Sequence, residues 1–563
     1  MIETSARRAT GRVWTLAASF SFIHLRRLQT YSSRAAALGE QPVGTKRPPE
    51  FHDYFVTHLP SSSLHPDTRG PTSPFHKLPR SASVPHTGDT THPPSFQSLG
   101  YRETTVVRIP LRSAKHHYGA QTARGTRVSN EDTYQAGVID IPAFAKRPPT
   151  SLTIRRSRNR DSSAPPPETR AAETATGDPQ VFYWGVFDGH GGSECSKFLR
   201  DYLHEYIQDA AFDFELCSSL GKNQLHLANG GRIPSFIGSL PVMQEGNRQR
   251  IGEMEKLLVQ QWRRLVGGYF KRFKPAKFQY YGSEDATRTD QDQVSIEELM
   301  EYAFLNADLD FVKAQASKKE YDMVQAEKPL NEDEILHSPS LRRTPQIGGP
   351  TRFKGGSTAT IAMISTPTPT PYWHPAGPST LLIAHVGDTR ALLCSTINGE
   401  AVQLTSNHHP SSPIEAARLR RYATSFVTDS FGEERMSGLA NTRAFGDVQS
   451  KRIGVSAEPE VRRVEMGAAE FSFLVLMSDG ISGTLPDQEV VDIIKEARTP
   501  DQGAADVVRF ATEVSRESDN ATCLVIRLGG WERRLEGGVG SLGTKESREW
   551  RRQEATDPRR SRR

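Results

Sequence analysis

The sequence contains few cysteines, and those it has are widely separated. Of its 563 residues only four are cysteines, Cys195, Cys217, Cys394 and Cys523. A disulfide framework or a zinc knuckle needs cysteines at short, recurring spacings. We therefore expect four reduced thiols in the folded chain rather than a cross-linked scaffold or a zinc site.

The sequence also lacks a large excess of charge of either sign. Its 71 lysine and arginine residues nearly balance 66 aspartate and glutamate residues, which leaves a formal net charge of +5. Basic residues are not interleaved with aromatic residues as they are in nucleic-acid-binding surfaces. We therefore expect no nucleic-acid partner.

The apolar run near the N-terminus, residues 14–23, is too short to cross a bilayer, so we expect no transmembrane segment there. The run lies among five arginines and a single acid, Glu3, a composition typical of mitochondrial transit peptides. We predict a transit peptide over residues 1–33 and a location in the mitochondrial matrix or intermembrane space. A secretory signal is the competing interpretation, although Arg26 and Arg27 interrupt it and no small-x-small cleavage site follows. A cytoplasmic location is the remaining alternative.

The composition indicates one sizeable core and much chain outside it. Only 36% of the residues are hydrophobic, and the 37 prolines cluster in a few stretches. Residues 34–114 are rich in Pro, Ser and His and are predicted to be disordered, because they cannot bury enough apolar area. We predict one folded domain over residues 115–529, with insertions at about 141–179 and 217–295. Residues 530–563 are expected to form a charged, solvated tail, and the protein to be a monomer.

Short acidic motifs recur over some four hundred residues, each at or just past the end of a probable strand. They are Glu131-Asp132, Asp188-Gly189-His190, Gly387-Asp388, Gly446-Asp447, Asp479-Gly480 and Asp519-Asn520. Each motif taken alone is usually a strand that runs into a turn. All six together are better explained by a fold that gathers carboxylates around hard divalent cations.

Apolar runs of strand length recur through the same region, and a helical pattern falls between two of them. The runs cover residues 181–187, 359–364, 381–386, 471–477 and 522–528. The helical pattern covers residues 487–497, with Val490, Val491, Ile493 and Ile494 on one side. Strands mixed with grouped helices indicate an α+β fold rather than regular βαβ alternation.

The six motifs, in this order, resemble the metal-dependent type 2C serine/threonine protein phosphatases, and among them the fungal mitochondrial members. The resemblance runs from about Tyr118 to Leu528 and includes the small-residue segment 355–359, the segment 457–460 and the helix around 303–308. It implies a four-layer sandwich, with two antiparallel β-sheets flanked by helices and a binuclear metal cleft at the sheet edge. Residues 115–529 would then be the catalytic domain.

The resemblance also implies which residues hold metal. Two Mg²⁺ or Mn²⁺ ions would share the carboxylate of Asp188, and the carbonyl of Gly189 would bind one of them. Asp479 and Asp519 would complete the shell of the other ion. Glu131 would act largely through water, and we include its neighbour Asp132 among the metal residues. Oxygen ligands alone suit Mg²⁺ or Mn²⁺ better than zinc.

Two basic residues are implied to act on the substrate. Arg127 resembles the family arginine that holds the substrate phosphate, a task that suits a planar guanidinium. The alternative is a surface arginine paired with a loop carboxylate. His190 resembles the family histidine proposed to protonate the leaving alcohol, which requires reach to the ester oxygen. The alternative is that His190 shapes the turn or orients a metal-bound water.

One departure from the family pattern affects a possible third ion. The family usually continues its late motif as Asp-Gly-x-Trp-Asp, but here Gly483 stands in place of the second acid. A third ion would rest on Asp388 and Asp479 without that carboxylate, so we do not expect it to bind firmly.

The function predicted is hydrolysis of phosphoserine and phosphothreonine in phosphorylated protein substrates by a water activated by two metal ions, without a covalent intermediate. One alternative is a catalytically inactive relative that binds phosphoproteins as a scaffold. Mutually repelling carboxylates are costly to keep in a dead site, which argues against it. Hydrolysis of small phosphoesters is a second alternative, because it would use the same metal residues.

Overall fold

The computed structural model describes most of the domain predicted from the sequence. Described are residues 117–146, 179–220, 242–278, 293–318, 347–420 except 369, 439–534 and 542–557, together with the backbone of strands at 54–60, 83–85, 104–110, 426–428 and 434–436. The transit peptide predicted over residues 1–33 lies outside the described residues.

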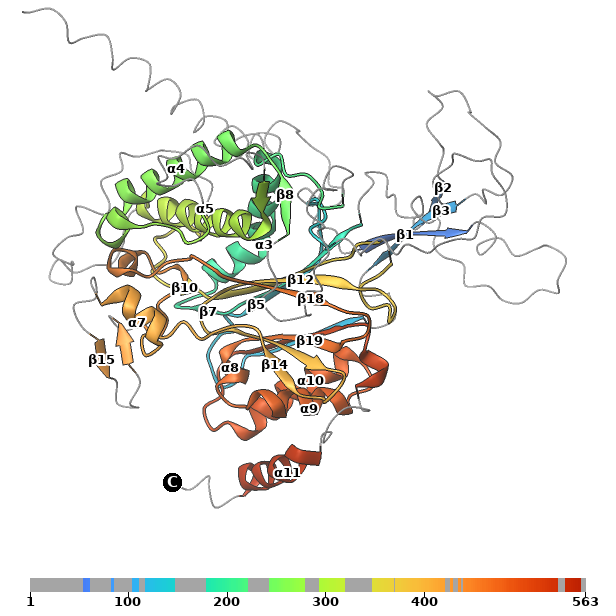
Figure 1. The fold of residues 1–563 in the computed structure, drawn as a ribbon. Helices are drawn as coiled ribbons and strands as arrows, with labels where there is room; N and C mark the ends of the chain where they lie inside the picture. The colour runs from blue at the N-terminus through green and yellow to red at the C-terminus, as the bar shows by residue number, and fades with distance from the viewer. Residues whose placement is uncertain are drawn as a thin grey trace, which may run out of the picture.

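Two five-stranded antiparallel sheets form the centre of the molecule (Figure 1). The first sheet has the order β18 (Glu460–Met466), β12 (Ser379–Val386), β11 (Ala359–Ser365), β6 (Val181–Phe187) and β5 (Thr133–Ile139). The second has the order β14 (Ala401–Gln403), β13 (Arg390–Ser395), β19 (Phe471–Met477), β20 (Ala521–Arg527) and β4 (Tyr118–Ala123).

The central strands are apolar on both faces because both faces are covered. Every residue of β6, β11, β12 and β19 is buried. Between the two sheets, Trp184 and Ile364 of the first pack with Leu474 and Leu524 of the second in one hydrophobic cluster. A strand covered on both sides reads as a continuous apolar run rather than an alternating one. This is why these strands could be predicted from the sequence.

Pairs of helices cover the outer faces of the sheets. Helices α3 (Glu194–Asp213) and α5 (Ile296–Ala316) pack on the first sheet, and α9 (Asp487–Glu496) and α10 (Pro500–Val514) on the second. The cap residues Ser295 and Thr499 accept hydrogen bonds from the third residue of α5 and α10, respectively. The predicted α+β sandwich of two antiparallel sheets between helices is confirmed, and the helix predicted over residues 487–497 is α9.

The described part of the 217–295 segment adds a further helical layer outside α5. Strand β8 (Met243–Glu245) pairs with β9 (Gln293–Ser295), and between them lie α4 (Arg248–Leu265) and the 3-10 helix η4 (Gly268–Arg272). Trp262 of α4 is fully buried and its indole Nε1 donates to the carbonyl of Leu305 of α5 at 3.2 Å. The apolar face of α4 is thus packed onto the domain.

A small three-stranded sheet joins two of the acidic motifs to the small-residue segment 355–359. Its order is β17 (Phe445–Gly446), β10 (Gly356–Ser357) and β7 (Gly189–His190). Gly356 pairs with Gly446 on one side and with His190 on the other. A Cβ atom on Gly356 would lie 2.4 Å from the carboxylate of Asp447, so this close approach requires glycine. Segments more than 250 residues apart in sequence therefore meet at the edge of the sandwich.

Smaller elements border this edge. They are α7 (Pro413–Leu419), the paired strands β15 (Phe426–Thr428) and β16 (Glu434–Met436), the 3-10 helix η6 (Val448–Ile453) and the one-turn helix α8 (Asp479–Ser482). Helix α8 follows β19 directly, with only Ser478 between them.

Three stretches of the predicted disordered segment 34–114 form a sheet. Strands β1 (Tyr54–Pro60) and β2 (Ser83–Pro85) both pair with β3 (Thr104–Pro110) in antiparallel register. The prediction of disorder is wrong for these stretches, and the rest of 34–114 lies outside the described residues. All three strands contain Val, and β1 and β3 also contain Thr; both residues favour extended backbone. These short strands could not be recognised from the average composition of the segment, which is rich in Pro, Ser and His.

Two other segments pack more closely than the sequence predicts. Of the insertion predicted at about 141–179, residues 141–146 are described, and Ile141 and Phe144 are buried in the core beside α3 and α5. The remainder, 147–178, lies outside the described residues. The tail after residue 530, predicted to be solvated, contains the 3-10 helix η7 (Trp531–Arg533) with a buried Trp531, and helix α11 (Leu542–Thr556). Helix α11 packs on α9 and α10 (Figure 1).

In the part of the chain that the structure describes, no helix combines the length and apolar character needed to cross a membrane.

Candidate active site

A cleft of about 730 Å³ opens where the strand ends and the small sheet meet. Its walls include residues from all six acidic motifs. These are Glu131, Asp188, Gly189, His190, Asp388, Asp447, Asp479, Asp519 and Asn520, together with Arg127. Of the predicted site residues, only Asp132 does not line the cleft.

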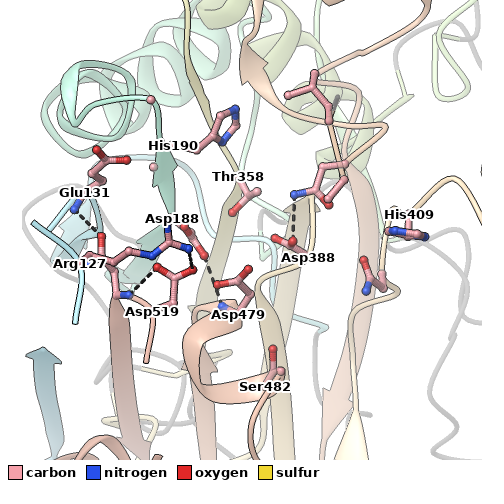
Figure 2. A pocket seen from close by; sticks show the side chains of 18 of the residues that line it. Arg127, Glu131, Asp188, His190, Thr358, Asp388, His409, Asp479, Ser482 and Asp519 are labelled. Carbon is pink, nitrogen blue, oxygen red and sulfur yellow. Dashed lines mark hydrogen bonds and ion pairs between the residues drawn. The ribbon is translucent and has the colours of Figure 1, made fainter. Parts of the chain in front are cut away.

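Three aspartates converge in the cleft (Figure 2). Asp188 follows the last residue of β6, Asp388 lies between β12 and β13, and Asp479 begins α8. One carboxylate oxygen from each lies within 4.8 Å of the other two. The three residues are more than 290 positions apart at the extremes, so the fold alone brings them together.

Without a bound cation, the protein disfavours the charged forms of these carboxyl groups. Burial raises the pKa of Asp188 well above its ordinary value, and the charges of Asp479, Asp132 and Asp388 raise it further. Burial, together with Asp388 and Asp519, raises the pKa of Asp479 to about 8. A bound divalent cation would reverse this situation, because it stabilises the charged carboxylates. The donor set is made of oxygen atoms, which fits Mg²⁺ or Mn²⁺.

The backbone holds Asp188 firmly. Its carbonyl accepts hydrogen bonds from the amide of Thr358 at 2.8 Å and from Ser357 Oγ at 3.0 Å. The amide of Asp479 donates to Asp188 Oδ2 at 3.3 Å, which ties the start of α8 to the end of β6. Next to Asp188, a Cβ atom on Gly189 would lie 2.6 Å from the carbonyl oxygen of Glu131. The close approach of two chain segments at the cleft therefore requires glycine at this position.

Arg127 forms an ion pair with Asp519 at the mouth of the cleft. Arg127 Nη2 lies 2.5 Å from Asp519 Oδ2, and the Arg127 side chain is 62% exposed (Figure 2). The hydrogen bond and charge of Asp519 raise the pKa of Arg127, so the guanidinium is charged. Arg127 is thus paired with a loop carboxylate, which was the alternative to phosphate binding. The same exposed guanidinium still faces the cleft.

Glu131 and Asp132 are neighbours with different surroundings. The amide of Glu131 donates to the side-chain oxygen of Asn520 at 2.7 Å, and the Glu131 side chain lines the cleft. Asp132 is only 6% exposed, and burial raises its pKa to about 6. It adds to the negative charge around Asp188 from behind the cleft wall.

Asp388 has a neutral hydrogen-bond partner, and the position where the family pattern has another acid is Gly483. The amide nitrogen of Asn441 donates to Asp388 Oδ2 at 2.9 Å. Gly483 lines the cleft with an ordinary helical φ of −75°. A Cβ atom there would lie 2.9 Å from the carbonyl oxygen of Asp479, so a side chain would need a small backbone shift.

His190 has a partner that the sequence analysis did not assign. Its Nε2 lies 2.9 and 3.0 Å from the two carboxylate oxygens of Asp447, which is 4% exposed. Burial lowers the pKa of His190, but the hydrogen bond and charge of Asp447 outweigh it, so the pKa is raised. Asp447 adopts a left-handed backbone with φ of 43°, and its amide donates to the carbonyl of Gly355 at 2.9 Å. The Gly446-Asp447 motif was visible in the sequence, but nothing there linked it to His190.

Comparison with known proteins agrees with this geometry. The family described as "Protein phosphatase 2C" matches residues 280–520. "Protein phosphatase 2C homolog 4" of Schizosaccharomyces pombe is 30% identical over 429 residues, which cover 76% of this chain and 84% of the relative. The chain belongs to the protein phosphatase 2C family. The recognition and the enzyme class predicted from the sequence, a protein serine/threonine phosphatase, are thereby confirmed.

Two further similarities are weaker, one because it covers less of the chain and the other because its sequence identity is lower. "Protein phosphatase 1K, mitochondrial" of Xenopus laevis is 38% identical over 152 residues, which cover 27% of this chain and 40% of the relative. A solved serine-threonine phosphatase 2C from Toxoplasma gondii aligns with a TM-score of 0.39 at 16% identity, covering 73% of this chain and 94% of that structure.

Proposed function

We propose that this protein phosphatase 2C hydrolyses phosphoserine and phosphothreonine in proteins with the help of two Mg²⁺ or Mn²⁺ ions. The observation that carries the proposal is the convergence of Asp188, Asp388 and Asp479 within 4.8 Å in a cleft lined by Arg127 and His190. Two such ions supply an activated water and neutralise the charge of the phosphate.

The chain's own residues divide into metal holders and substrate groups. We propose that Asp188 would help to hold both ions, with Gly189 and Glu131 contributing to one and Asp479 and Asp519 to the other. Asp132 would tune these ligands from behind the cleft wall. Gly483 offers no carboxylate, so a third ion beside Asp388 is left out of the proposal.

Arg127 is proposed to bind the substrate phosphate. Its guanidinium has five N–H donors, and a single pairing with Asp519 leaves donors for phosphate oxygens. The ion pair with Asp519 orients the guanidinium at the cleft mouth. Holding the phosphate there would place the ester oxygen within the cleft.

His190 is proposed to give a proton to the leaving serine or threonine oxygen. Asp447 binds Nε2 and so fixes the orientation of the ring.

A water nucleophile fits the lining, because no cysteine is among the described residues that line the cleft. The nearby Cys195 is buried, and its pKa is raised well above the ordinary value by burial, so its thiol stays protonated.

Phosphate release from a panel of substrates tests this function. The full chain should hydrolyse phosphoserine and phosphothreonine peptides with Mn²⁺, and a chelator should abolish the activity. Binding of these peptides without turnover would support the inactive scaffold instead. Faster turnover of small phosphoesters than of any phosphopeptide would support the small-molecule alternative.

We further propose that the protein acts in mitochondria, as a monomer and without nucleic acid. Support for the compartment comes from the arginine-rich residues 1–33 and from one relative that is named mitochondrial. A fluorescent protein fused after residue 33 should enter mitochondria and be shortened there. Retention in the cytosol or entry into the secretory pathway would contradict the proposed compartment and leave the phosphatase proposal intact.

A further inference from the structure

Helix α11 is attached to the second helix layer through three arginines. Arg548 pairs with Glu496 of α9 at 2.9 Å, and Arg552 pairs with Glu513 of α10 at 3.3 Å. Arg551 pairs with Glu489 in the first turn of α9. Helix α11 lies beyond residue 520, the last residue of the family match.

Arg551 also makes a contact to a backbone carbonyl outside α9 and α10. Its Nη2 donates to the carbonyl of Thr484 at 2.9 Å, while Nη1 binds the carboxylate of Glu489, a residue only 3% exposed. A guanidinium is planar and carries donors in a fixed fork, so it can hold both partners at once. Arg551 therefore connects α11 to the short loop between α8 and α9.

That loop is the direct continuation of the cleft wall. Ser482 and Gly483 line the cleft, and Thr484 follows them. The Thr484 hydroxyl donates to the carbonyl of Gly480 at 3.2 Å, and the Gly483 amide donates to the carbonyl of Asp479 at 2.7 Å. A helix of one turn has little stability of its own, so contacts at its ends decide where it lies.

We propose that Arg551 is a positioning residue for Asp479, acting through Thr484 and the one-turn helix α8. It holds the C-terminal end of α8, while the hydrogen bond between the Asp479 amide and Asp188 holds the N-terminal end. The C-terminal helix thus takes part in arranging the metal ligands from the opposite side of the cleft wall. This inference rests on the proposed function, in which Asp479 binds a divalent ion.

The test compares Mn²⁺ affinity in two matched variants of the full chain. Arg551→Ala removes the contacts to Thr484 and Glu489. Arg548→Ala removes the ion pair between the same helix and Glu496 of α9. Calorimetric titration should show Mn²⁺ binding weakened about tenfold in Arg551→Ala, the scale typical for groups that support metal ligands. Arg548→Ala should stay within about twofold of wild type.

The outcomes separate this inference from the function on which it rests. Equal Mn²⁺ affinity in folded Arg551→Ala and in wild type would overturn the positioning role. Absence of Mn²⁺ binding to the wild type would instead overturn the proposed metal site. If Arg551→Ala does not fold, Arg551→Lys carries the test, because a lysine keeps the charge near Glu489 but lacks the fork. Its Mn²⁺ affinity should be lower than that of wild type, and an affinity equal to wild type would overturn the role.

Discussion

Lys451 and Asp308 form an ion pair in which neither side chain is exposed to solvent. Lys451 Nζ lies 2.5 Å from Asp308 Oδ2 and also donates to the carbonyl of Ala444 at 2.7 Å. Asp308 Oδ1 accepts from the amide of Gly446 at 2.9 Å. The pair therefore connects α5 to the segment that presents Asp447 to the cleft.

Removing one member of this pair should destabilise the fold strongly. Lys451→Met leaves the carboxylate of Asp308 buried without its cation, which costs about 3 to 5 kcal/mol in such pairs. Urea unfolding would measure the loss, with exposed Lys274→Met as the control, expected to change stability by less than about 0.5 kcal/mol. A similar loss of unfolding free energy in the two variants would show that the buried ion pair does not stabilise the fold in this way.

Asp447→Asn should slow turnover without weakening metal binding. The amide keeps the size of the carboxylate but removes the charge that orients His190 through Nε2. We expect kcat to fall by about 10- to 100-fold, part of the factor that a positioned proton donor contributes. Asp506→Asn, in an exposed ion pair on α10, serves as the control. Unchanged kcat in Asp447→Asn would remove the His190 and Asp447 pair from the catalytic account.

Arg127→Ala should act mainly on substrate capture. Its guanidinium is exposed at the cleft mouth, so we expect KM for a phosphopeptide to rise by about tenfold or more while calorimetric Mn²⁺ affinity stays nearly intact. Arg127→Lys should recover only part of the loss, because an ammonium lacks the fork. A large drop in Mn²⁺ affinity would show that Arg127 mainly orients Asp519 instead.

Glu415 should make the fold sensitive to acid. Burial would raise its pKa, but the charges of Arg418 and Arg443 outweigh burial and lower the pKa to about 2. Because the folded pKa lies below the ordinary value of 4.5, the stabilisation is complete above about pH 4.5 and is lost as pH falls toward 2. A shift of this size corresponds to about 3 kcal/mol.

The test measures the difference in free energy of unfolding between wild type and Glu415→Gln. Urea unfolding from pH 7 to pH 3 should show a constant gap in stability above about pH 5, which narrows as the pH falls further. A gap that stays constant down to pH 3 would show that the two arginines do not lower the pKa of Glu415 in the folded protein.

The central strands could be predicted from the sequence because they are buried on both faces, whereas the two-sheet sandwich was implied by the resemblance to the phosphatase family. Strands β6, β11, β12, β19 and β20 coincide with continuous apolar runs, and acidic motifs follow the ends of β6, β12 and β19. The pairing of His190 with Asp447 could not be predicted, because 257 positions separate the two residues and no local spacing connects them. Helix α11 was also missed. It docks largely through arginines, so its sequence looks like a solvated tail rather than an apolar face.

Asp188 is proposed to organise a metal site for phosphate ester hydrolysis, and the activity of Asp188→Asn tests this role. The measurement is phosphate release from a phosphothreonine peptide at saturating Mn²⁺, with circular dichroism to verify that the variant is folded. We expect turnover to fall by orders of magnitude, because Asp188 is the proposed ligand common to both ions. Turnover within about threefold of wild type in the folded variant would contradict it.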